Sequence, residues 1–330
     1  MLLYSRVFLF NMNFQMIEPV FESKKYMDIA FQKANALAKL SKYSKIKDRI
    51  NRKKSLERDK INTIKDVLCH RTKKIVNSFP SFEQLDEFYE EIIESMVDLD
   101  KTKKSLSKIW WASEKITELS FQNIKKIGQM EEKDKIIGVR KAYYGRVSSV
   151  MQRINKDLIF IEDVRKKIRE LPDVKDVFTV CIAGFPNVGK STLLSKLTDA
   201  KPKINNYSFT TKRLNIGYFS KSYHPIQVID TPGTLNRFNK MNNIEKQAYL
   251  AVKLKSNIVV YVFDLTMQYP IDEQKKLLIK IENEGKKVII FLSKTDILPK
   301  DVVSSFIQEL GKKEIYTNIE LLKEKLKESI

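Results

Sequence analysis

A glycine-rich segment in the second half of the chain combines residue types that bind phosphate. The pattern is G-x-x-x-x-G-K-S, and it runs from Gly184 to Ser191. Glycines let backbone N–H groups curl around phosphate oxygens, and a helix that starts after the second glycine adds favourable partial charge. The Lys190 ammonium can reach the β- and γ-phosphates, while the Ser191 hydroxyl can ligate Mg²⁺. The segment therefore predicts a site for a nucleoside triphosphate.

The flanking residues supply the setting that this motif requires. Residues 178–183 form an apolar run typical of a buried strand, and residues 190–197 have the pattern of a helix. A chance glycine turn between a strand and a helix is the alternative, and the complete strand–loop–helix context disfavours it. The residues predicted to line the phosphates are Gly184, Phe185, Pro186, Asn187, Val188, Gly189, Lys190, Ser191 and Thr192.

Two later segments carry groups that complete a triphosphate site. Asp230 follows an apolar run, and a carboxylate there can hold Mg²⁺ through water, while Gly233 lets its N–H approach the γ-phosphate. Earlier in the chain, Thr210 and Thr211 are two candidates for a further Mg²⁺ ligand; the sequence does not separate them, and we favour Thr211. The predicted metal ligands are Ser191, Thr211 and Asp230, and the predicted catalytic residues are Lys190, Thr211 and Gly233.

A fourth segment, Ser293-Lys294-Thr295-Asp296, directly follows the apolar run VIIFL and predicts the base. The Asp296 carboxylate can accept hydrogen bonds from N1–H and N2–H₂ of guanine, and adenine offers no such pair of donors. A site of this kind discriminates by roughly 10⁴ to 10⁵. The Lys294 stem can pack on the purine ring. We predict that Ser293, Lys294 and Asp296 bind guanine; a polar turn that closes the strand is the alternative.

Composition sets broad limits on the rest of the chain. The 330 residues suffice for two domains, and a hydrophobic fraction of 42% is ordinary for a soluble protein. Apolar runs are far shorter than a membrane span, and the two cysteines indicate a reducing compartment. We therefore expect a cytoplasmic protein without a membrane partner. The net charge of +20 favours a polyanionic partner, with a solvated basic surface as the alternative.

The first half of the chain is poor in glycine and proline and has helical periodicity. We expect residues 1–16 to form a disordered tail and residues 17–171 to form an antiparallel helical bundle domain. A capping box of Ser81 and Gln84 should start its third helix. In the fourth helix, one of two adjacent tryptophans should pack in the core. The expected helices span residues 23–40, 45–77, 82–97, 101–127 and 145–170.

Residues 172–330 alternate apolar strands with amphipathic helices, which is typical of a mostly parallel sheet covered on both faces. The predicted fold is therefore an α/β P-loop NTPase domain after an all-α bundle, with the ligand at the carboxyl ends of the strands. The expected strands span residues 178–183, 214–219, 226–229, 258–264, 287–292 and 314–316. The expected helices span residues 190–197, 244–254, 272–284, 300–310 and 319–329.

The order of the motifs resembles that of the Obg-related branch of the translation-factor-related GTPases. Beyond it, the segments SFPSFEQLDEFYEEIIESMVD, IAGFPNVGKSTLLSKLT and VIDTPGTL are similar to the nucleolar GTP-binding protein family, over most of residues 17–300. The compact length is similar to that of its archaeal members. The resemblance implies a GTPase with its G domain at residues 172–330, which binds GTP and GDP with Mg²⁺ as cofactor.

The same resemblance implies a nucleotide-dependent switch in assembly of the large ribosomal subunit, with ribosomal RNA and proteins of its precursor as partners. We also expect a monomer. The competing hypothesis is a GTP-dependent regulatory module that acts on a non-ribosomal protein, and an ATPase is the alternative enzyme class.

Three segments depart from the patterns of related GTPases. Ser293 stands where N-K-x-D has asparagine, and residues 316–318 (YTN) stand where a small-residue loop commonly closes the base site. Thr234 and Leu235 follow D-x-x-G, where many GTPases carry a glutamine that orients the attacking water. We therefore expect slow intrinsic hydrolysis that a partner stimulates.

The expected mechanism also includes a potassium ion beside the phosphates and the ordering of two loops. Asn187 occupies the position that ligates a potassium ion in some related GTPases, and stiffening of the loop is its alternative role. Bound triphosphate and Mg²⁺ should order residues 206–212 and 233–239, and hydrolysis should release them.

Overall fold

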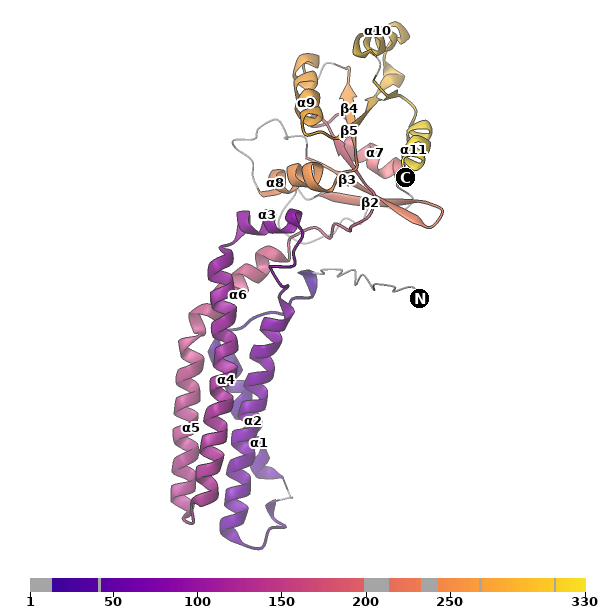
Figure 1. Cartoon of the computed structure of the whole chain (residues 1–330). Helices are drawn as coiled ribbons and strands as arrows, with labels where there is room; N and C mark the ends of the chain where they lie inside the picture. Colours follow the sequence, from indigo (N-terminus) through magenta and orange to yellow (C-terminus); the bar gives the residue numbers. More distant parts are fainter. Residues whose placement is uncertain (1–13, 41–42, 199–213, 233–242, 267–268, 312) are drawn as a thin grey trace, which may run out of the picture. The chain divides into compact units, whose positions relative to one another are not determined.

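The computed structural model describes residues 14–40, 43–198, 214–232, 243–266, 269–311 and 313–330. By packing, the chain divides into two units, which Figure 1 shows coloured along the sequence. The helical unit comprises the residues up to Gln84 together with Met96–Leu171, and the sheet unit comprises Leu85–Ser95 and Pro172–Ile330. Each unit has a hydrophobic core of its own.

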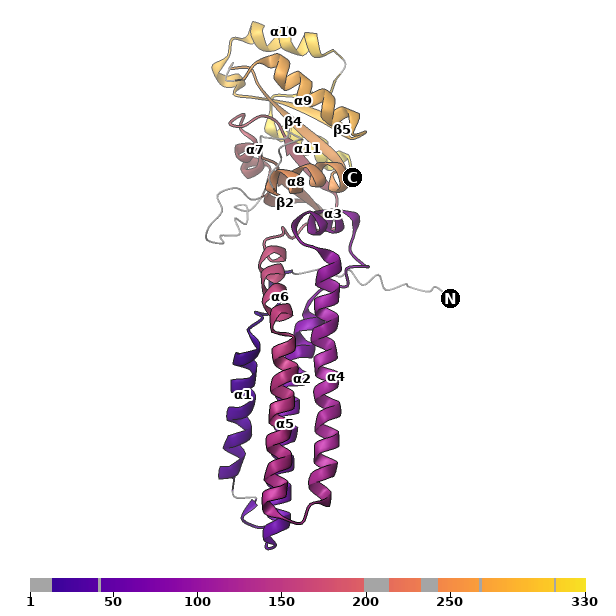
Figure 2. The same ribbon diagram turned by 90° about the vertical axis from the view of Figure 1, so that its left-hand side faces the viewer.

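Long helices build the described part of the helical unit. Their bounds are α1 Ser23–Ala36, α2 Arg49–Ser78, α4 Leu99–Gln129, α5 Lys133–Arg153 and α6 Asn155–Ile168, with 3₁₀ turns at Phe14–Met16 and Leu37–Lys39. α2 and α4 lie side by side, and α5 and α6 pack against α4 (Figure 2). Aliphatic residues at helical spacing, such as Ile61, Ile64 and Leu68 of α2, are fully buried between them. The predicted all-α region is confirmed.

The last helix of this unit differs from the prediction, which places one helix over residues 145–170. The chain forms two helices instead, and they meet at Ile154, where φ is −91° and ψ is 2°. Gly145 lies inside α5 rather than at a helix start. The prediction of one helix was wrong because no proline or glycine near Ile154 signals the break.

Neither of the two adjacent tryptophans of α4 packs in the core. Trp110 and Trp111 are each 39% exposed. The Lys73 ammonium lies 4.9 Å from the Trp110 ring centroid, and the Arg153 guanidinium carbon lies 5.6 Å from that of Trp111. Such cation–π pairs contribute about 0.5–1 kcal/mol at exposed sites. The prediction of a core tryptophan was wrong because aliphatic and small polar side chains fill the buried side of α4.

Helix α3, Glu87–Met96, belongs to the sheet unit although the segments before and after it lie in the helical unit. The Tyr89 hydroxyl accepts a hydrogen bond from the Val174 amide at 2.9 Å, and its proton can be donated to the carbonyl oxygen of Pro172 at 3.0 Å or of Val174 at 3.2 Å. The carboxylate of Asp86, just before the helix, forms an ion pair with Lys255 at 3.0 Å. These contacts attach α3 to the segment that precedes the sheet and to the turn before its fourth strand.

The start of α3 also differs from the prediction. Ser81 and Gln84 form a turn, closed by the Gln84 amide and the Ser81 carbonyl at 3.1 Å, and the helix begins later. Asp86 provides the side-chain cap, because its carboxylate accepts a hydrogen bond from the Tyr89 amide at 3.2 Å. The predicted capping box was therefore wrong.

The described part of the sheet unit contains a six-stranded sheet. Its strands are β1 Thr179–Ala183, β2 Asn215–Lys221, β3 His224–Asp230, β4 Ile258–Asp264, β5 Lys287–Ser293 and β6 Ile315–Tyr316. They lie in the order β2-β3-β1-β4-β5-β6, and every neighbouring pair is parallel except β2 with β3. The central β1 and β4 are buried along their whole length, as their continuous apolar sequences predict. The predicted mostly parallel sheet is confirmed.

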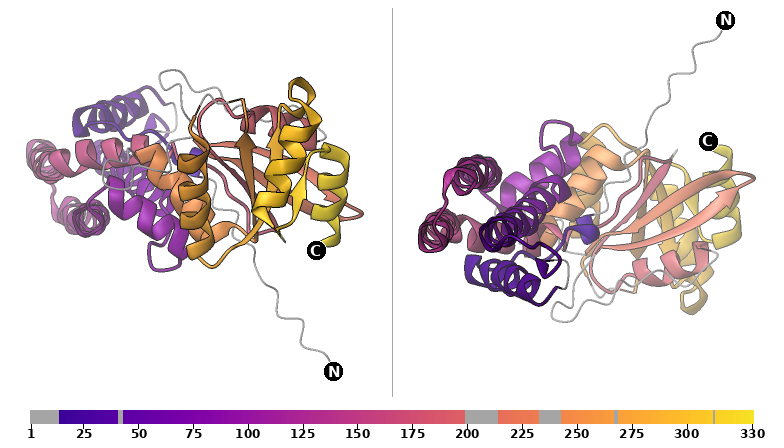
Figure 3. Two further views of the ribbon diagram at one scale, coloured as in Figure 1. Left: turned by 90° about the horizontal axis from the view of Figure 1, so that it is seen from above. Right: turned by 90° about the horizontal axis from the view of Figure 1, so that it is seen from below.

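Helices cover both faces of this sheet (Figure 3). α7 and α11 pack together on one face, and α8 and α9 lie on the other. Among the described residues, no helix is both long and apolar enough to cross a membrane. The helix bounds are α7 Lys190–Leu197, α8 Asn243–Leu250 continued by a π-helical turn over Ala251–Lys255, α9 Ile271–Asn283, α10 Lys300–Leu310 and α11 Ile319–Glu328.

Candidate nucleotide-binding site

The loop between β1 and α7 has the backbone that its glycines require. Gly184 has a φ of 146°, and a Cβ at this position would lie 2.6 Å from the Val262 carbonyl oxygen of β4. Gly189 has a φ of 97° directly before α7. A side chain at Gly184 would push β4 away, so glycine alone permits this approach. The first amides of α7 have no partner within the helix, which makes them donors for an anion.

The Lys190 side chain is enclosed in this loop, and the residue is 7% exposed. Its ammonium donates a hydrogen bond to the Phe185 carbonyl oxygen at 2.6 Å. Burial lowers the pKa of Lys190 to about 8, although the Asp230 carboxylate nearby opposes this effect. The loop thus holds a desolvated lysine where the motif predicts phosphate, and phosphate oxygens would stabilise its charged form.

Ser191 and Asp230, from α7 and the end of β3, meet as the predicted magnesium site requires. The Ser191 hydroxyl donates to Oδ2 of Asp230 at 2.5 Å. Oδ1 of Asp230 is buried and has no hydrogen-bond partner among the described residues. Burial raises the pKa of Asp230, while the hydrogen bond from Ser191 and the charge of Lys190 oppose this rise. A hydroxyl beside an unpaired carboxylate oxygen fits Mg²⁺, which prefers hard oxygen ligands.

Asn215 is a residue of this site that the sequence did not predict. Its side-chain amide donates to Oδ2 of Asp230 at 3.3 Å. The pairing arises because β2 and β3 form a hairpin whose register places Asn215 opposite Asp230. The hairpin turns at Ser222 and Tyr223, which lack the Asn-Gly or Asp-Gly signal of such turns, so the register could not be counted from the sequence.

The remaining loop residues divide into buried and exposed positions. The Phe185 ring is buried and lies 5.1 Å from the Tyr269 ring, and Val188 is buried beneath the loop. Thr192 is exposed. Asn187 is exposed and has a φ of 60°, a left-handed conformation that asparagine tolerates better than most residues. Its residue type therefore has a conformational reason that is independent of any ion.

The predicted base-binding residues begin at Ser293, the last residue of β5, at the same edge of the sheet as the phosphate loop. The Ser293 hydroxyl donates to the Phe263 carbonyl oxygen at 2.9 Å, so it links the ends of β5 and β4. Lys294 has a φ of 54° and forms an ion pair with Asp264. Asp296 is exposed, and no hydrogen bond to its carboxylate is found in the described part of the chain, so its oxygens are open to a ligand.

Several predicted residues lie outside the described ranges. They are Thr210, Thr211, Gly233, Thr234, Leu235 and the whole of the two expected switch segments, residues 206–212 and 233–239. In the place of the missing small-residue loop, Asn318 caps α11, because its side-chain oxygen accepts from the Glu320 amide at 2.8 Å.

Comparison with known proteins finds a matching family for each of the two parts of the chain. Residues 14–175 match the NOG1 N-terminal helical domain, and residues 179–294 match the 50S ribosome-binding GTPase family. An uncharacterized protein of Methanocaldococcus jannaschii is 37% identical over 252 residues, which are 75% of this chain and 71% of that protein. Nucleolar GTP-binding protein 1 of Eremothecium gossypii is 31% identical over 72% of this chain. This chain belongs to the nucleolar GTP-binding protein family.

The relatives differ in length from this chain. It spans 38% of the Eremothecium protein and 44% of Nucleolar GTP-binding protein 1 of Arabidopsis thaliana, which is 29% identical over 298 residues. Among solved structures, the G domain of the T. maritima FeoB iron transporter is 28% identical and covers 46% of this chain and 98% of that chain, with a TM-score of 0.37.

Membership of the nucleolar GTP-binding protein family makes the sheet unit a GTP-binding G domain. The family match from residue 179 to residue 294 begins with β1 and contains the phosphate loop, Asp230 and Lys294. The match from 14 to 175 contains the helical unit and α3. The predicted family and fold class are confirmed.

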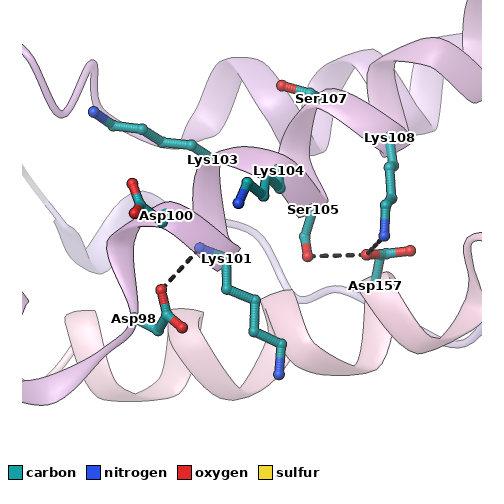
Figure 4. A pocket seen from close by; sticks show the side chains of 9 residues that line it. All are labelled: Asp98, Asp100, Lys101, Lys103, Lys104, Ser105, Ser107, Lys108 and Asp157. Carbon is teal, nitrogen blue, oxygen red and sulfur yellow. Dashed lines mark hydrogen bonds and ion pairs between the residues drawn. The ribbon is translucent and has the colours of Figure 1, made fainter.

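A separate hollow lies in the helical unit, on α4 and α6 (Figure 4). On its floor, Asp157 accepts hydrogen bonds from the Ser105 hydroxyl at 2.9 Å and the Lys108 ammonium at 3.2 Å. The other lysines of α4 at this hollow, Lys101, Lys103 and Lys104, are exposed to solvent. The residues that line the hollow are Asp98, Asp100, Lys101, Lys103, Lys104, Ser105, Ser107, Lys108 and Asp157.

Proposed function

We propose that this protein hydrolyses GTP to GDP and phosphate with Mg²⁺ and acts as a nucleotide-dependent switch in assembly of the large ribosomal subunit. The observation that carries the first part is the meeting of Ser191 and Asp230, with an unpaired carboxylate oxygen, beside the enclosed Lys190. These groups come from two segments of the chain, the start of α7 and the end of β3, and converge where the carboxyl ends of β1 and β3 adjoin.

Different residues of this site bind different parts of the nucleotide in this proposal. The amides of the loop and of the first turn of α7 hold the phosphates, and Lys190 adds positive charge to the β- and γ-oxygens. Ser191 directly and Asp230 through water would hold Mg²⁺, which would neutralise charge on these oxygens. Thr211 and Gly233 complete the site from the two switch segments in this proposal, and Asp296 selects guanine.

The ribosomal role is supported by the family, by charge and by the surface of the helical unit. The G domain matches a family described as a 50S ribosome-binding GTPase. The net charge is +20, and four lysines line the hollow on α4 and α6 beside three aspartates, of which Asp157 pairs with Lys108. Lysines of this kind bind phosphates of RNA largely through counterion release. The two free cysteines among the described residues support the proposed cytoplasmic location, and we propose a monomer.

We propose that α3 couples the nucleotide bound in the sheet unit to the helical unit. The second switch segment leads into α8, and the π-helical turn that continues α8 ends at Lys255, which pairs with Asp86. π-Helical turns often occur at functional sites. The chain continues from both ends of α3 into the helical unit. In this proposal, a shift of α8 on hydrolysis moves α3, from which the chain continues into the helical unit.

Co-sedimentation tests the ribosomal role. The full chain is mixed with large subunits or their precursors from the same organism, with GTP, GDP or a non-hydrolysable GTP analogue. We expect retention with the analogue and release with GDP. Lys190→Met, which weakens nucleotide binding, should lose this difference. Absence of binding in every nucleotide state would favour the competing hypothesis, a regulatory module for a non-ribosomal protein.

Hydrolysis should be slow without a partner and faster with potassium. We propose Asn187 as a ligand of K⁺ beside the phosphates, where a cation offsets transition-state charge. GTP turnover in KCl should exceed turnover in NaCl at equal ionic strength. Asn187→Gly is the matched variant, because glycine keeps the left-handed backbone and removes the side-chain oxygen. Equal turnover in the two salts, or stimulation that survives in the variant, would remove potassium from the proposal.

A further inference from the structure

Asp264 is a buried carboxylate that the proposed phosphate and magnesium chemistry does not use. It is the last residue of β4 and is 1% exposed. One oxygen, Oδ2, lies 2.5 Å from the Lys294 ammonium. The other, Oδ1, accepts hydrogen bonds from the Thr266 amide at 2.9 Å and the Thr266 hydroxyl at 2.7 Å. Both oxygens are therefore occupied, and one of them holds a residue of the base-binding segment.

The backbone of Asp264 is held as firmly as its side chain. The Gln274 side chain, which is fully buried, donates to the Asp264 carbonyl oxygen at 2.9 Å and accepts from the Asp264 amide at 3.1 Å. Burial alone would raise the pKa of Asp264, but the hydrogen bonds from Lys294 and Thr266 lower it below its ordinary value. The carboxylate is thus ionised and fixed, which suits it to orient a cation.

The backbone of Lys294 is in the left-handed conformation, so an anchored side chain helps to hold this residue in place. Its φ of 54° and ψ of 29° are left-handed, a conformation that costs free energy for a residue with a Cβ. Its side chain is 33% exposed, so burial does not hold it in place. The ion pair with Asp264, 30 residues earlier in the chain, fixes the end of the side chain. Asp296 follows two residues later in the same short turn.

We propose that Asp264 is a positioning residue for the purine: it anchors Lys294 so that the lysine stem and the turn carrying Asp296 are in place before the nucleotide arrives. This inference rests on the proposed function, because it takes a guanine nucleotide as the ligand. Pre-ordering the turn avoids an entropic cost on binding. Asp264 acts through Lys294 and contacts neither phosphate nor metal.

A double-mutant cycle tests this role by calorimetry with GDP and Mg²⁺. Asp264→Asn keeps the shape of the side chain and removes the charge, and we expect GDP affinity to fall about tenfold. In a Lys294→Met background, the same change should cost less than about twofold, because the anchored group is already absent. Thr266→Val removes a partner of Oδ1 but leaves the Lys294 pair, so its GDP affinity should stay within about twofold of the wild type.

Tripolyphosphate, which has no base, separates positioning from misfolding. Its affinity should be the same in the wild type and Asp264→Asn, because the phosphate loop is intact. If Asp264→Asn has a lower melting temperature than the wild type and loses tripolyphosphate binding, Asp264→Glu becomes the test variant. Asp264→Glu keeps the charge and should retain more GDP affinity than Asp264→Ala. Equal GDP losses from Asp264→Asn in both backgrounds would overturn the inference. Failure of the wild type to bind GDP would instead refute the proposed function.

Discussion

Asp296→Asn is expected to lower the affinity for GTP by a factor of roughly 10² to 10⁴ and to allow binding of xanthosine triphosphate. The Asp296 carboxylate is exposed at the end of β5 and is free to accept both guanine donors. Each hydrogen bond to a charged group contributes about 1.5–3 kcal/mol, and the asparagine amide would also oppose a guanine donor. Xanthine carries an oxygen in place of the 2-amino group, which the amide can bind. Competition against a fluorescent nucleotide measures both affinities.

Asp301→Asn is the matched control for this change. Asp301 is also exposed and lies in the first turn of α10, five residues further along the chain. The Asp301→Asn substitution removes the same charge without changing the base-binding segment, so the GTP affinity should stay within about twofold of that of the wild type. Unchanged GTP binding in Asp296→Asn would place the guanine site elsewhere.

Lys190→Met is expected to have opposite effects on GTP affinity and on stability. Loss of the ammonium should lower GTP affinity by roughly tenfold to a hundredfold, since a hydrogen bond to a charged group contributes about 1.5–3 kcal/mol. Without nucleotide and magnesium, the variant should be more stable than the wild type. Burial that lowers the pKa of Lys190 from 10.5 to about 8 costs the folded protein roughly 3 kcal/mol at neutral pH, and methionine avoids this cost. Urea unfolding at pH 7 measures the difference.

The stability difference should shrink as the pH rises. Below pH 8 the folded protein keeps Lys190 protonated, so the cost of burying the charge is fully present. Between pH 8 and 10.5 the folded state releases this proton while the unfolded state keeps it, so the wild type gains stability relative to Lys190→Met. Lys196→Met, an exposed position of the same helix, should show neither effect. A variant that is less stable than the wild type at pH 7 would contradict this account.

The order of elements and the position of the phosphate loop could be predicted because both depend on local patterns. Continuous apolar runs marked β1, β4 and β5, and amphipathic periodicity marked α7 and α10, whose predicted bounds agree with the structure. The glycines at 184 and 189 predicted backbone conformations that require glycine, and these are present. Ser191 and Asp230 were predicted to meet because parallel strands place their carboxyl ends at one edge.

Other features depend on contacts that no local pattern contains. The division of residues 145–170 into two helices occurs at Ile154 without proline or glycine nearby. The placement of α3 follows from Tyr89 and Asp86, whose partners lie more than 80 residues away in the chain. Sequence periodicity predicts which face of a helix is buried but not which unit buries it.

The sequence by itself predicted a phosphate loop, a carboxylate after a strand that suits magnesium and an aspartate that suits guanine. Each of these is encoded within a few consecutive residues, because glycine conformation and strand ends are local properties. Only the tertiary structure decided that Asn215 joins Asp230 and that Asp264 holds Lys294. These pairs depend on hairpin register and strand order, and they become neighbours only when the sheet has formed.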